Sequence, residues 1–446
     1  MTTESTSRDT VVGADSSVEL PDAGPRPPAS GPTRAQALGS RRVGTGLTPP
    51  SIRPGGPDGA PSGPPVSKPW SHRLLIIGRI SAYFLASRLA LAFSVLVVKW
   101  LFPTFHVVNS LGAGWDGGWY TRIARYGYPH GLVHEFGGSR WGFFPALPIA
   151  ERAVVEITGI SYPAAGFVVA LIFGWASAIA VWLAVREVFG PDIADRSVLL
   201  YLFFPISFVL SMGYTEGLFI ATSAFCLFAL SRRYWLSAAG LAVIGGLTRS
   251  FGVVLVVAVV VTCLIALRSE RRLRPVLAIL IAPVGFVGWL IYSWRQAGTP
   301  LAFVKSESYW GNSHFVWLTT PFHSMAHLLT GEHAWTVAPD VLASLAMVVM
   351  VAGLLLLLLA HRSGVPVPAA WWIYAVLSVL GAMSPYWPTS MLRYSLAVFP
   401  MFAAFAWKLR GTWFTTVVAI CALGQGALAV MLLAGLVHPQ ATLLAP

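Results

Sequence analysis

The stretch "PAAGFVVALIFGWASAIAVWLAV" (residues 163–185) runs for 23 residues without a charged side chain. A helix of about 20 apolar residues is long enough to cross the roughly 30 Å hydrocarbon core of a bilayer. Similar runs recur along the chain, which has 56% hydrophobic residues, 11% charged residues and a mean hydropathy of +0.68. Soluble domains carry about 25% charged residues. The composition therefore excludes a soluble globular protein and predicts an all-α polytopic membrane protein.

Outward from this stretch, the apolar pattern predicts a bundle of about eleven transmembrane helices. The fifth and sixth are short, and "GGLTRSFG" (residues 245–252) between them is also compatible with a break in one longer helix. No internal repeat of the kind that marks inverted-repeat transporters is visible. The predicted spans are 75–101, 163–185, 196–212, 216–231, 235–247, 252–268, 274–294, 341–360, 367–383, 392–408 and 412–437.

Residues 1–72 have a different composition, dominated by Pro, Gly, Ser and Thr. Such a segment has too little apolar surface to offset its ordering entropy, so we predict a disordered tail before a transmembrane domain over 73–440. The tail is too long and too polar for a secretory signal peptide. Between Arg26 and Arg73 it carries seven basic residues and one acid, Asp58, which favours a cytoplasmic position beside the lipid.

Basic residues predict the orientation of the bundle. If the N-terminus is cytoplasmic, the short loops that carry them are also cytoplasmic. This distribution follows the positive-inside rule. The net charge of +12 is therefore a topology signal rather than a sign of nucleic-acid binding. The long loops 102–162 and 295–340 then face outside, and we expect a multi-pass protein of the cell membrane. The basic positions are Arg186 and Arg196, Arg232 and Arg233, 268–274, Arg362, and Lys408 with Arg410.

The first long outer loop contains "AGWDGGWYTRIARYGYP" (residues 113–129), in which an aspartate stands between tryptophans. Asp116 opens a predicted amphipathic helix whose apolar stripe is Trp119, Ile123 and Tyr126, and Gly127 suits its C-terminal end. We expect this interfacial or re-entrant helix to lie along the membrane surface with its tryptophans among the headgroups. A purely structural role for Asp116 is that of an N-cap, which accepts a hydrogen bond from a backbone N–H.

Three more ionisable residues are predicted on the outer side: Glu216 between the third and fourth spans, Arg249 after the fifth, and Arg393 at the start of the tenth. Such residues are costly near a bilayer and either pair or function. Arginines suit a lipid-linked phosphate, and a shielded carboxylate suits a general base for an acceptor hydroxyl. The alternative is that Glu216 forms a structural ion pair with Arg249 or Arg393. The cysteines show no metal or redox spacing and no loop has a compact Asp-x-Asp pair, so no metal and no cofactor is predicted.

Five motifs follow one another along the chain: "WDGGWYTRIARYGY" (115–128), "FFPALP" (143–148), "FFPISFVLSMGYTEGLF" (203–219), "LTRSFG" (247–252) and "LRYSLAVFP" (392–400). In this order they resemble the motifs of the PIG-V mannosyltransferase family, over roughly residues 75–410. The chain departs from the family pattern at Phe204 and Phe251, where asparagine is usual.

The resemblance implies an integral membrane glycosyltransferase of the GT-C superfamily. It would transfer mannose, with inversion, from a polyprenyl-phosphate donor to a lipid- or envelope-associated acceptor on the extracytoplasmic face, or in the endoplasmic reticulum membrane in a eukaryote. The donor is a substrate, so no cofactor is implied. By this resemblance Asp116 is the base, Glu216 an orienting acid, and Arg249 and Arg393 bind the donor phosphate. The implied contacts to sugar or lipid are Trp115, Trp119, Tyr120, Tyr214 and Tyr394.

Two other functions share part of these features. A transporter or flippase for a lipid-linked sugar would also need phosphate-binding arginines, but it should expose polar residues on both faces. A non-catalytic partner of another glycosyltransferase would explain the aromatic loops without requiring Asp116.

Overall fold

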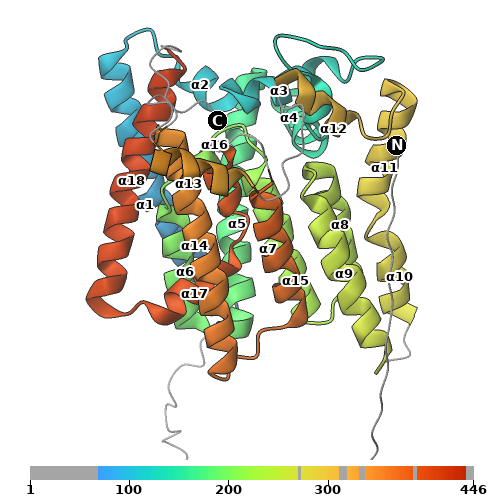
Figure 1. The fold of residues 1–446 in the computed structure, drawn as a ribbon, viewed down its shortest axis with the longest axis vertical. Helices are drawn as coiled ribbons and strands as arrows, with labels where there is room; N and C mark the ends of the chain where they lie inside the picture. Colours follow the sequence, from blue (N-terminus) through green and yellow to red (C-terminus); the bar gives the residue numbers. More distant parts are fainter. Residues whose placement is uncertain (1–68, 270–272, 311–318, 331–336, 385–388, 438–446) are drawn as a thin grey trace, which may run out of the picture. The chain divides into compact units, whose positions relative to one another are not determined.

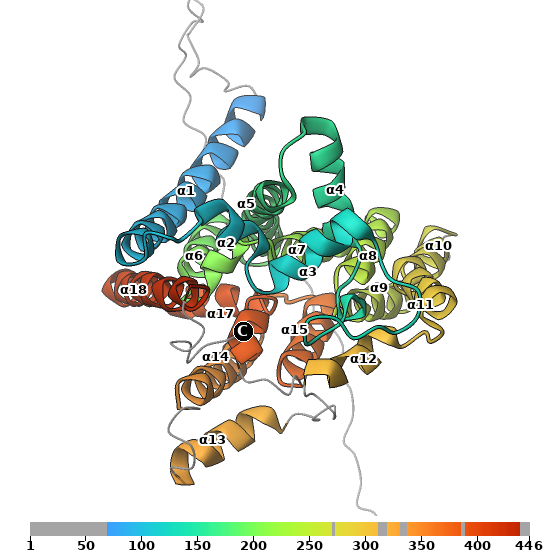
Figure 2. The ribbon, with the colours of Figure 1, turned by 90° about the horizontal axis from the view of Figure 1, so that it is seen from above.

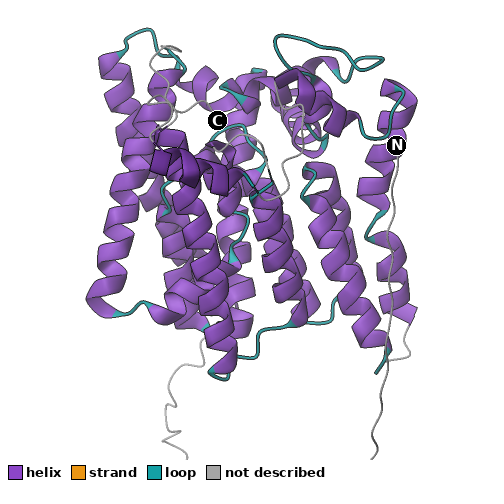
Figure 3. Cartoon of the chain, in the orientation of Figure 1, coloured by secondary structure: helices purple, strands orange, loops and turns teal. Residues whose placement is uncertain are grey.

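The computed structural model describes residues 69–269, 273–310, 319–330, 337–384 and 389–437. All regular secondary structure in these ranges is helical, as Figure 3 shows, apart from one isolated bridge between Glu135 and Gly138. The predicted all-α class is therefore confirmed. The predicted disordered tail lies outside the described residues up to position 68, and residues 69–72 already belong to the first helix.

Five stretches are long and apolar enough to cross a membrane: Arg73–Leu101, Tyr162–Phe189, Leu273–Ala297, Pro339–Arg362 and Gly411–Gly435. They lie within α1 (Pro69–Leu101), α5 (Tyr162–Phe189), α10 (Leu273–Ile281) with α11 (Val284–Ala297), α14 (Val337–Arg362) and α18 (Gly411–Gly435). Shorter apolar helices are α7 (Glu216–Ser231), α8 (Trp235–Thr248), α9 (Gly252–Leu267) and α15 (Ala369–Ala382). The chain is thus a helical membrane protein, and the total of eleven spans stays a prediction.

Prolines split three of the predicted spans into two pieces each. The segment 196–212 becomes α6 (Pro191–Phe203) and the 3-10 turn η2 (Ser207–Ser211), with Pro205 between them. Pro283 separates α10 from α11, and Pro400 begins α17 (Pro400–Lys408) after α16 (Thr389–Ser395). Proline lacks a backbone N–H and disfavours helical geometry at the residue before it. Two of these breaks place non-helical backbone beside Glu216 and Arg393.

The segment around Arg249 is a tight hairpin rather than one long helix. Arg249 is extended (φ −168°, ψ 166°) between α8 and α9. The two helices touch closely enough that a methyl group added at Gly252 would overlap the carbonyl group of Gly245. The side chain of Arg249 is therefore carried at the tip of a rigid turn.

Short helices gather at one end of the bundle, which we call the α3 end. In Figure 1, α2, α3, α4, α12 and α13 lie at this end, opposite the α14–α15 and α17–α18 connections. Figure 2 looks onto it, and α2, α3 and α4 all pack against α5. The bounds are α2 (Val107–Ala113), α3 (Asp116–Tyr126), η1 (Arg140–Gly142), α4 (Ala146–Thr158), α12 (Ala302–Ser306), η3 (Glu307–Trp310) and α13 (Thr320–Thr330).

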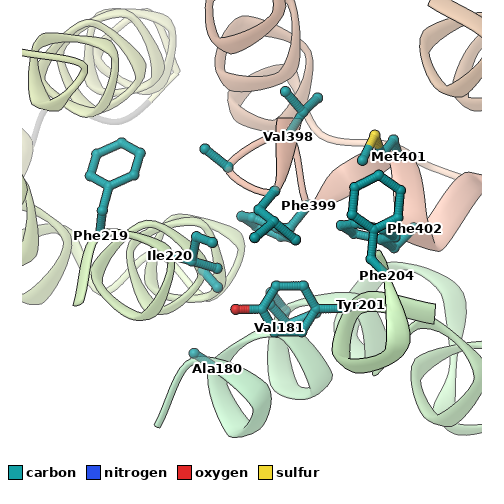
Figure 4. Close-up of a cluster of buried hydrophobic side chains, with 14 of the residues drawn as sticks. Ala180, Val181, Tyr201, Phe204, Phe219, Ile220, Val398, Phe399, Met401 and Phe402 are labelled. Atoms are coloured by element: carbon teal, nitrogen blue, oxygen red, sulfur yellow. The ribbon is translucent and has the colours of Figure 1, made fainter. Parts of the chain in front are cut away.

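A buried hydrophobic cluster joins α5, α6 and α7 to α17 and to the turn before it (Figure 4). The ring of Phe402 packs edge-on against those of Tyr201 and Phe204, at 5.7 and 5.3 Å between centroids. The hydroxyl group of Tyr374 donates a 2.6 Å hydrogen bond to the carbonyl oxygen of Ala397. Because these side chains are almost fully buried, they hold the turn that follows Arg393 against the rest of the core.

Candidate active site

Four ionisable side chains from four separate segments meet at the α3 end. Nη1 of Arg393 lies 2.5 Å from Oδ2 of Asp116, although the two residues are 277 positions apart in the chain. Nε of Arg393 is 3.3 Å from Oε1 of Glu216, and Nη1 of Arg249 is 3.2 Å from the same oxygen. Glu216 therefore bridges both arginines. We call these four residues the acid–arginine quartet.

The quartet is buried and carries no net formal charge, since two carboxylates face two guanidinium groups. Glu216 is 2% exposed and Arg393 6%, whereas the side chain of Asp116 is 27% exposed. Guanidinium groups keep their charge in proteins, and Asp116 is the member of the quartet most open to a ligand.

Aromatic rings enclose the two guanidinium groups. That of Arg249 lies 4.6 Å from the ring of Tyr394 and 5.4 Å from that of Phe251, and that of Arg393 lies 4.9 Å from Tyr214 and 5.2 Å from Tyr394. Tyr394 therefore contacts both arginines. Burial, with a contribution from the nearby carboxylate of Asp116, raises the pKa of Tyr214 well above its ordinary value, so its hydroxyl keeps its proton. Cation–π contacts of this kind hold the guanidinium groups in place.

The N-cap role considered for Asp116 is wrong. The N-cap of α3 is Trp115, and Asp116 is the first helical residue, whose carboxylate pairs with Arg393 instead. Trp115 has φ 50°, a strained conformation for a bulky residue that turns the chain abruptly into the helix. Gly117 follows because a Cβ there would lie 2.8 Å from the carbonyl oxygen of Gly112. The predicted helix end at Gly127 (φ 70°) is confirmed.

The buried face of α3 differs from the predicted stripe. Tyr120, Ile123 and Ala124 are buried, and Tyr120 packs in a cluster with side chains of α4 and α5. Its hydroxyl lies 3.5 Å from Oγ1 of Thr215, next to Glu216. Tyr126, assigned to the stripe, is exposed. The apolar face of α3 thus packs against protein, because α4 and α5 cover the side that the sequence assigns to lipid.

Arg88 supports the quartet from within α1, a role that the sequence analysis missed. Its Nη1 donates to Oγ of Ser211 at 2.7 Å and to the carbonyl oxygen of Ser207 at 3.2 Å, in η2. The backbone N–H of Gly213 then donates to the carbonyl oxygen of Leu111 in α2 at 2.8 Å. The non-helical segment before Glu216 is therefore tied to two helices. An arginine inside the apolar run 75–101 is the sequence signal that could have revealed it.

Glu151 of α4 is a second acid that the sequence analysis missed. Its side chain is fully buried, and neither carboxylate oxygen has a hydrogen-bond partner among the described residues. Burial raises the pKa of Glu151 to about 9, so the group is neutral near pH 7. In the same described part of the chain, no group of three or more histidine, cysteine, aspartate or glutamate side chains is arranged to hold a metal ion.

Residues 145–294, about one third of the chain, match a family described as dolichyl-phosphate-mannose-protein mannosyltransferase. The match supports a membrane glycosyltransferase; it includes Glu216 and Arg249 and leaves Asp116 and Arg393 outside. No curated protein matches the sequence. Among solved structures, the oligosaccharyltransferase of Archaeoglobus fulgidus, in complex with zinc and sulfate, superposes with a TM-score of 0.40 at 14% identity. The alignment covers 73% of this chain and 48% of that protein, so this chain spans about half its length, and a score this low fixes neither fold nor activity.

Proposed function

We propose that this protein transfers mannose from a polyprenyl-phosphate donor to a lipid- or envelope-associated acceptor. The observation that carries the proposal is the partly exposed carboxylate of Asp116, held at 2.5 Å by Arg393 beside the buried ion pair of Glu216 and Arg249. The partial match to a mannosyltransferase family supports the same chemistry. Because the basic loops lie at the other end of the bundle, we assign the α3 end to the extracytoplasmic face of the cell membrane and the N-terminus to the cytoplasm.

In the proposed reaction Asp116 accepts the proton of the acceptor hydroxyl. The acceptor oxygen attacks the anomeric carbon of the sugar, and the bond from that carbon to the phosphate oxygen breaks. The polyprenyl phosphate leaves with the electron pair, so no separate acid is required, and attack from the opposite side inverts the configuration. Arg393 fixes Oδ2 of Asp116, and we assign Oδ1 to the acceptor.

The arginines have a second task in this proposal. Their guanidinium groups each offer five N–H donors, more than their contacts to carboxylates use, so Arg249 and Arg393 can also donate to the donor phosphate. Glu216 keeps both arginines in place.

Five aromatic residues are the proposed contacts to sugar or lipid. The indole N–H of Trp115 is buried without a hydrogen-bond partner among the described residues, which makes it suitable for a sugar hydroxyl, and the ring of Tyr214 lies against the guanidinium group of Arg393. The other three are Trp119, Tyr120 and Tyr394.

A transfer assay separates this proposal from its rivals. The purified protein in lipid nanodiscs is incubated with radiolabelled polyprenyl-phosphate mannose and a lipid extract of its host, and products are separated by chromatography. A transferase yields a new labelled glycoside and releases unlabelled polyprenyl phosphate. A flippase would instead move the labelled lipid across proteoliposomes with no product, and a non-catalytic partner would do neither. Transport without product would overturn the proposal.

A further inference from the structure

A third arginine of the α3 end is held in a stack of aromatic rings. The guanidinium group of Arg122 lies 3.9 Å from the ring centroid of Phe136 and 5.6 Å from that of Trp119. The ring of Trp119 in turn stacks on Phe143, at 5.7 Å and 13° between ring planes. A planar guanidinium group in such a stack keeps its N–H groups at the edge, where they can bind an anion.

The loop that contains Phe136 is held in place by a backbone bridge and by the side chain of Arg140. The bridge between Glu135 and Gly138 closes a hairpin, and Arg140 clamps its base through contacts of 2.6 and 3.0 Å to Glu135. Arg140 also donates to the carbonyl oxygen of Gly127 at the end of α3, at 2.6 Å. Phe136 itself has φ 51° and is 83% exposed. An exposed ring in this conformation is held by its surroundings rather than by local preference.

The charge balance at the α3 end indicates that a bound phosphate needs a further cation. The quartet has no net formal charge, so an anionic phosphate that binds beside it adds uncompensated negative charge in a buried site, which is costly. Arg122 has no carboxylate partner within the described residues. It stands six residues after Asp116, or about 9 Å further along the same helix. Six residues turn the helix by about 600°, so Arg122 also lies about 120° round the axis from Asp116, and it is a cation that can compensate the charge of a phosphate bound at the α3 end.

We propose that Arg122, sandwiched between Trp119 and Phe136, binds the phosphate group of the lipid-linked sugar donor. This inference rests on the proposed function and deepens it, since it adds a third arginine that selects an anionic lipid. In this proposal the phosphate lies between Arg249 and Arg393 on the reacting side and Arg122 on the side of α3 where Phe136 lies. The aromatic rings keep the guanidinium group in position before the donor arrives, which reduces the entropy lost on binding.

A binding experiment tests the proposal without requiring turnover. A short polyprenyl phosphate and the neutral polyprenol of the same length are bound to the full-length protein in phosphatidylcholine nanodiscs, with intrinsic tryptophan fluorescence as the readout. Wild type should prefer the phosphate. Arg122→Gln should weaken phosphate binding roughly tenfold, the effect of one charge-assisted contact, and leave polyprenol binding unchanged. Arg122→Lys keeps the charge but not the planar stack, so it should recover part of the loss.

Arg125→Gln is the matched control, because Arg125 lies on the same helix and its guanidinium group contacts the ring of Tyr126. It should bind both lipids as wild type does. If Arg122→Gln bound the phosphate as tightly as wild type, or lost affinity for both lipids equally, the role of Arg122 would be overturned. The proposed function would not be affected by that result.

The measurement is repeated in nanodiscs that contain anionic phosphatidylglycerol. A loss of binding that appears only there would also overturn the role of Arg122, because it would make Arg122 a headgroup contact. A wild type without preference for the phosphate would overturn the proposed donor as well.

Discussion

Replacing Arg393 with leucine removes the cation that joins the two acids of the quartet. The side chain is 6% exposed and contacts Asp116 at 2.5 Å and Glu216 at 3.3 Å. Leucine is apolar and shorter, and it leaves Glu216 buried with Arg249 as its remaining ionic partner in the quartet. The variant should therefore lose both stability and the orientation of Asp116.

Removing one partner of a buried ion pair costs about 3–5 kcal/mol, mostly because a charge stays buried without its partner. Glu216 keeps the contact to Arg249 at 3.2 Å, and Asp116 is partly exposed. We therefore expect Arg393→Leu to lower the free energy of unfolding by about 3 kcal/mol, at the lower end of that range. The double variant Asp116→Leu with Arg393→Leu should lose less than the sum of the two single variants, since it no longer strands a carboxylate.

Unfolding by SDS titration in mixed micelles measures these differences. Arg152→Leu is the matched control, because Arg152 pairs with Glu156 on the exposed face of α4 and both side chains are more than half exposed. Such a pair contributes little, so this variant should unfold like wild type. If Arg393→Leu were as stable as Arg152→Leu, or if the losses of the double variant were simply additive, the quartet would not be a coupled buried network.

Three further predictions concern the groups around the quartet. Burial raises the pKa of Glu151 to about 9, so the folded protein holds a proton that the unfolded chain releases near pH 4.3. The free energy of unfolding should therefore fall as the pH rises from about 4.3 to about 9. Glu151→Gln should flatten the pH dependence of the thermal midpoint between about pH 5 and 9. Gly213→Ala should destabilise by about 1–3 kcal/mol in the SDS titration, because the added methyl group overlaps the carbonyl oxygen of Gly112. Arg88→Met should cost about 2 kcal/mol and also lower the transfer rate, because it frees the segment that carries Glu216; unchanged transfer would contradict the supporting role of Arg88.

The bounds of several helices could be predicted from the apolar runs of the sequence. The predicted span 216–231 coincides with α7 (Glu216–Ser231), and 75–101 ends where α1 ends. The pattern failed at Pro205, Pro283 and Pro400, where apolar composition continues but the backbone cannot remain helical. Hydropathy records which residues avoid water and contains no information on the hydrogen bonds that proline removes.

The four residues of the quartet could be predicted from the sequence, because ionisable side chains are energetically costly near a bilayer. Which of them pair with one another could not be predicted. Asp116 and Arg393 are 277 residues apart, and no local pattern specifies that α3 and α16 meet. The capping role of Asp116 was misjudged because the positive φ of Trp115 shifts the helix start by one residue. Glu151 was missed because an acid in an amphipathic helix normally faces water, and only the packing of α4 shows that this one is buried.

The most direct test of the central claim is the rate of sugar transfer by Asp116→Asn. Asparagine keeps the size and a hydrogen-bond acceptor for Arg393 but cannot take a proton from the acceptor hydroxyl. The variant, purified in nanodiscs and folded as wild type by circular dichroism, should transfer labelled mannose at least a hundredfold more slowly, the typical contribution of a general base. Glu156→Gln, which removes an exposed acid of α4, should transfer at the wild-type rate. Transfer by Asp116→Asn at the wild-type rate would contradict the assignment of Asp116 as the base.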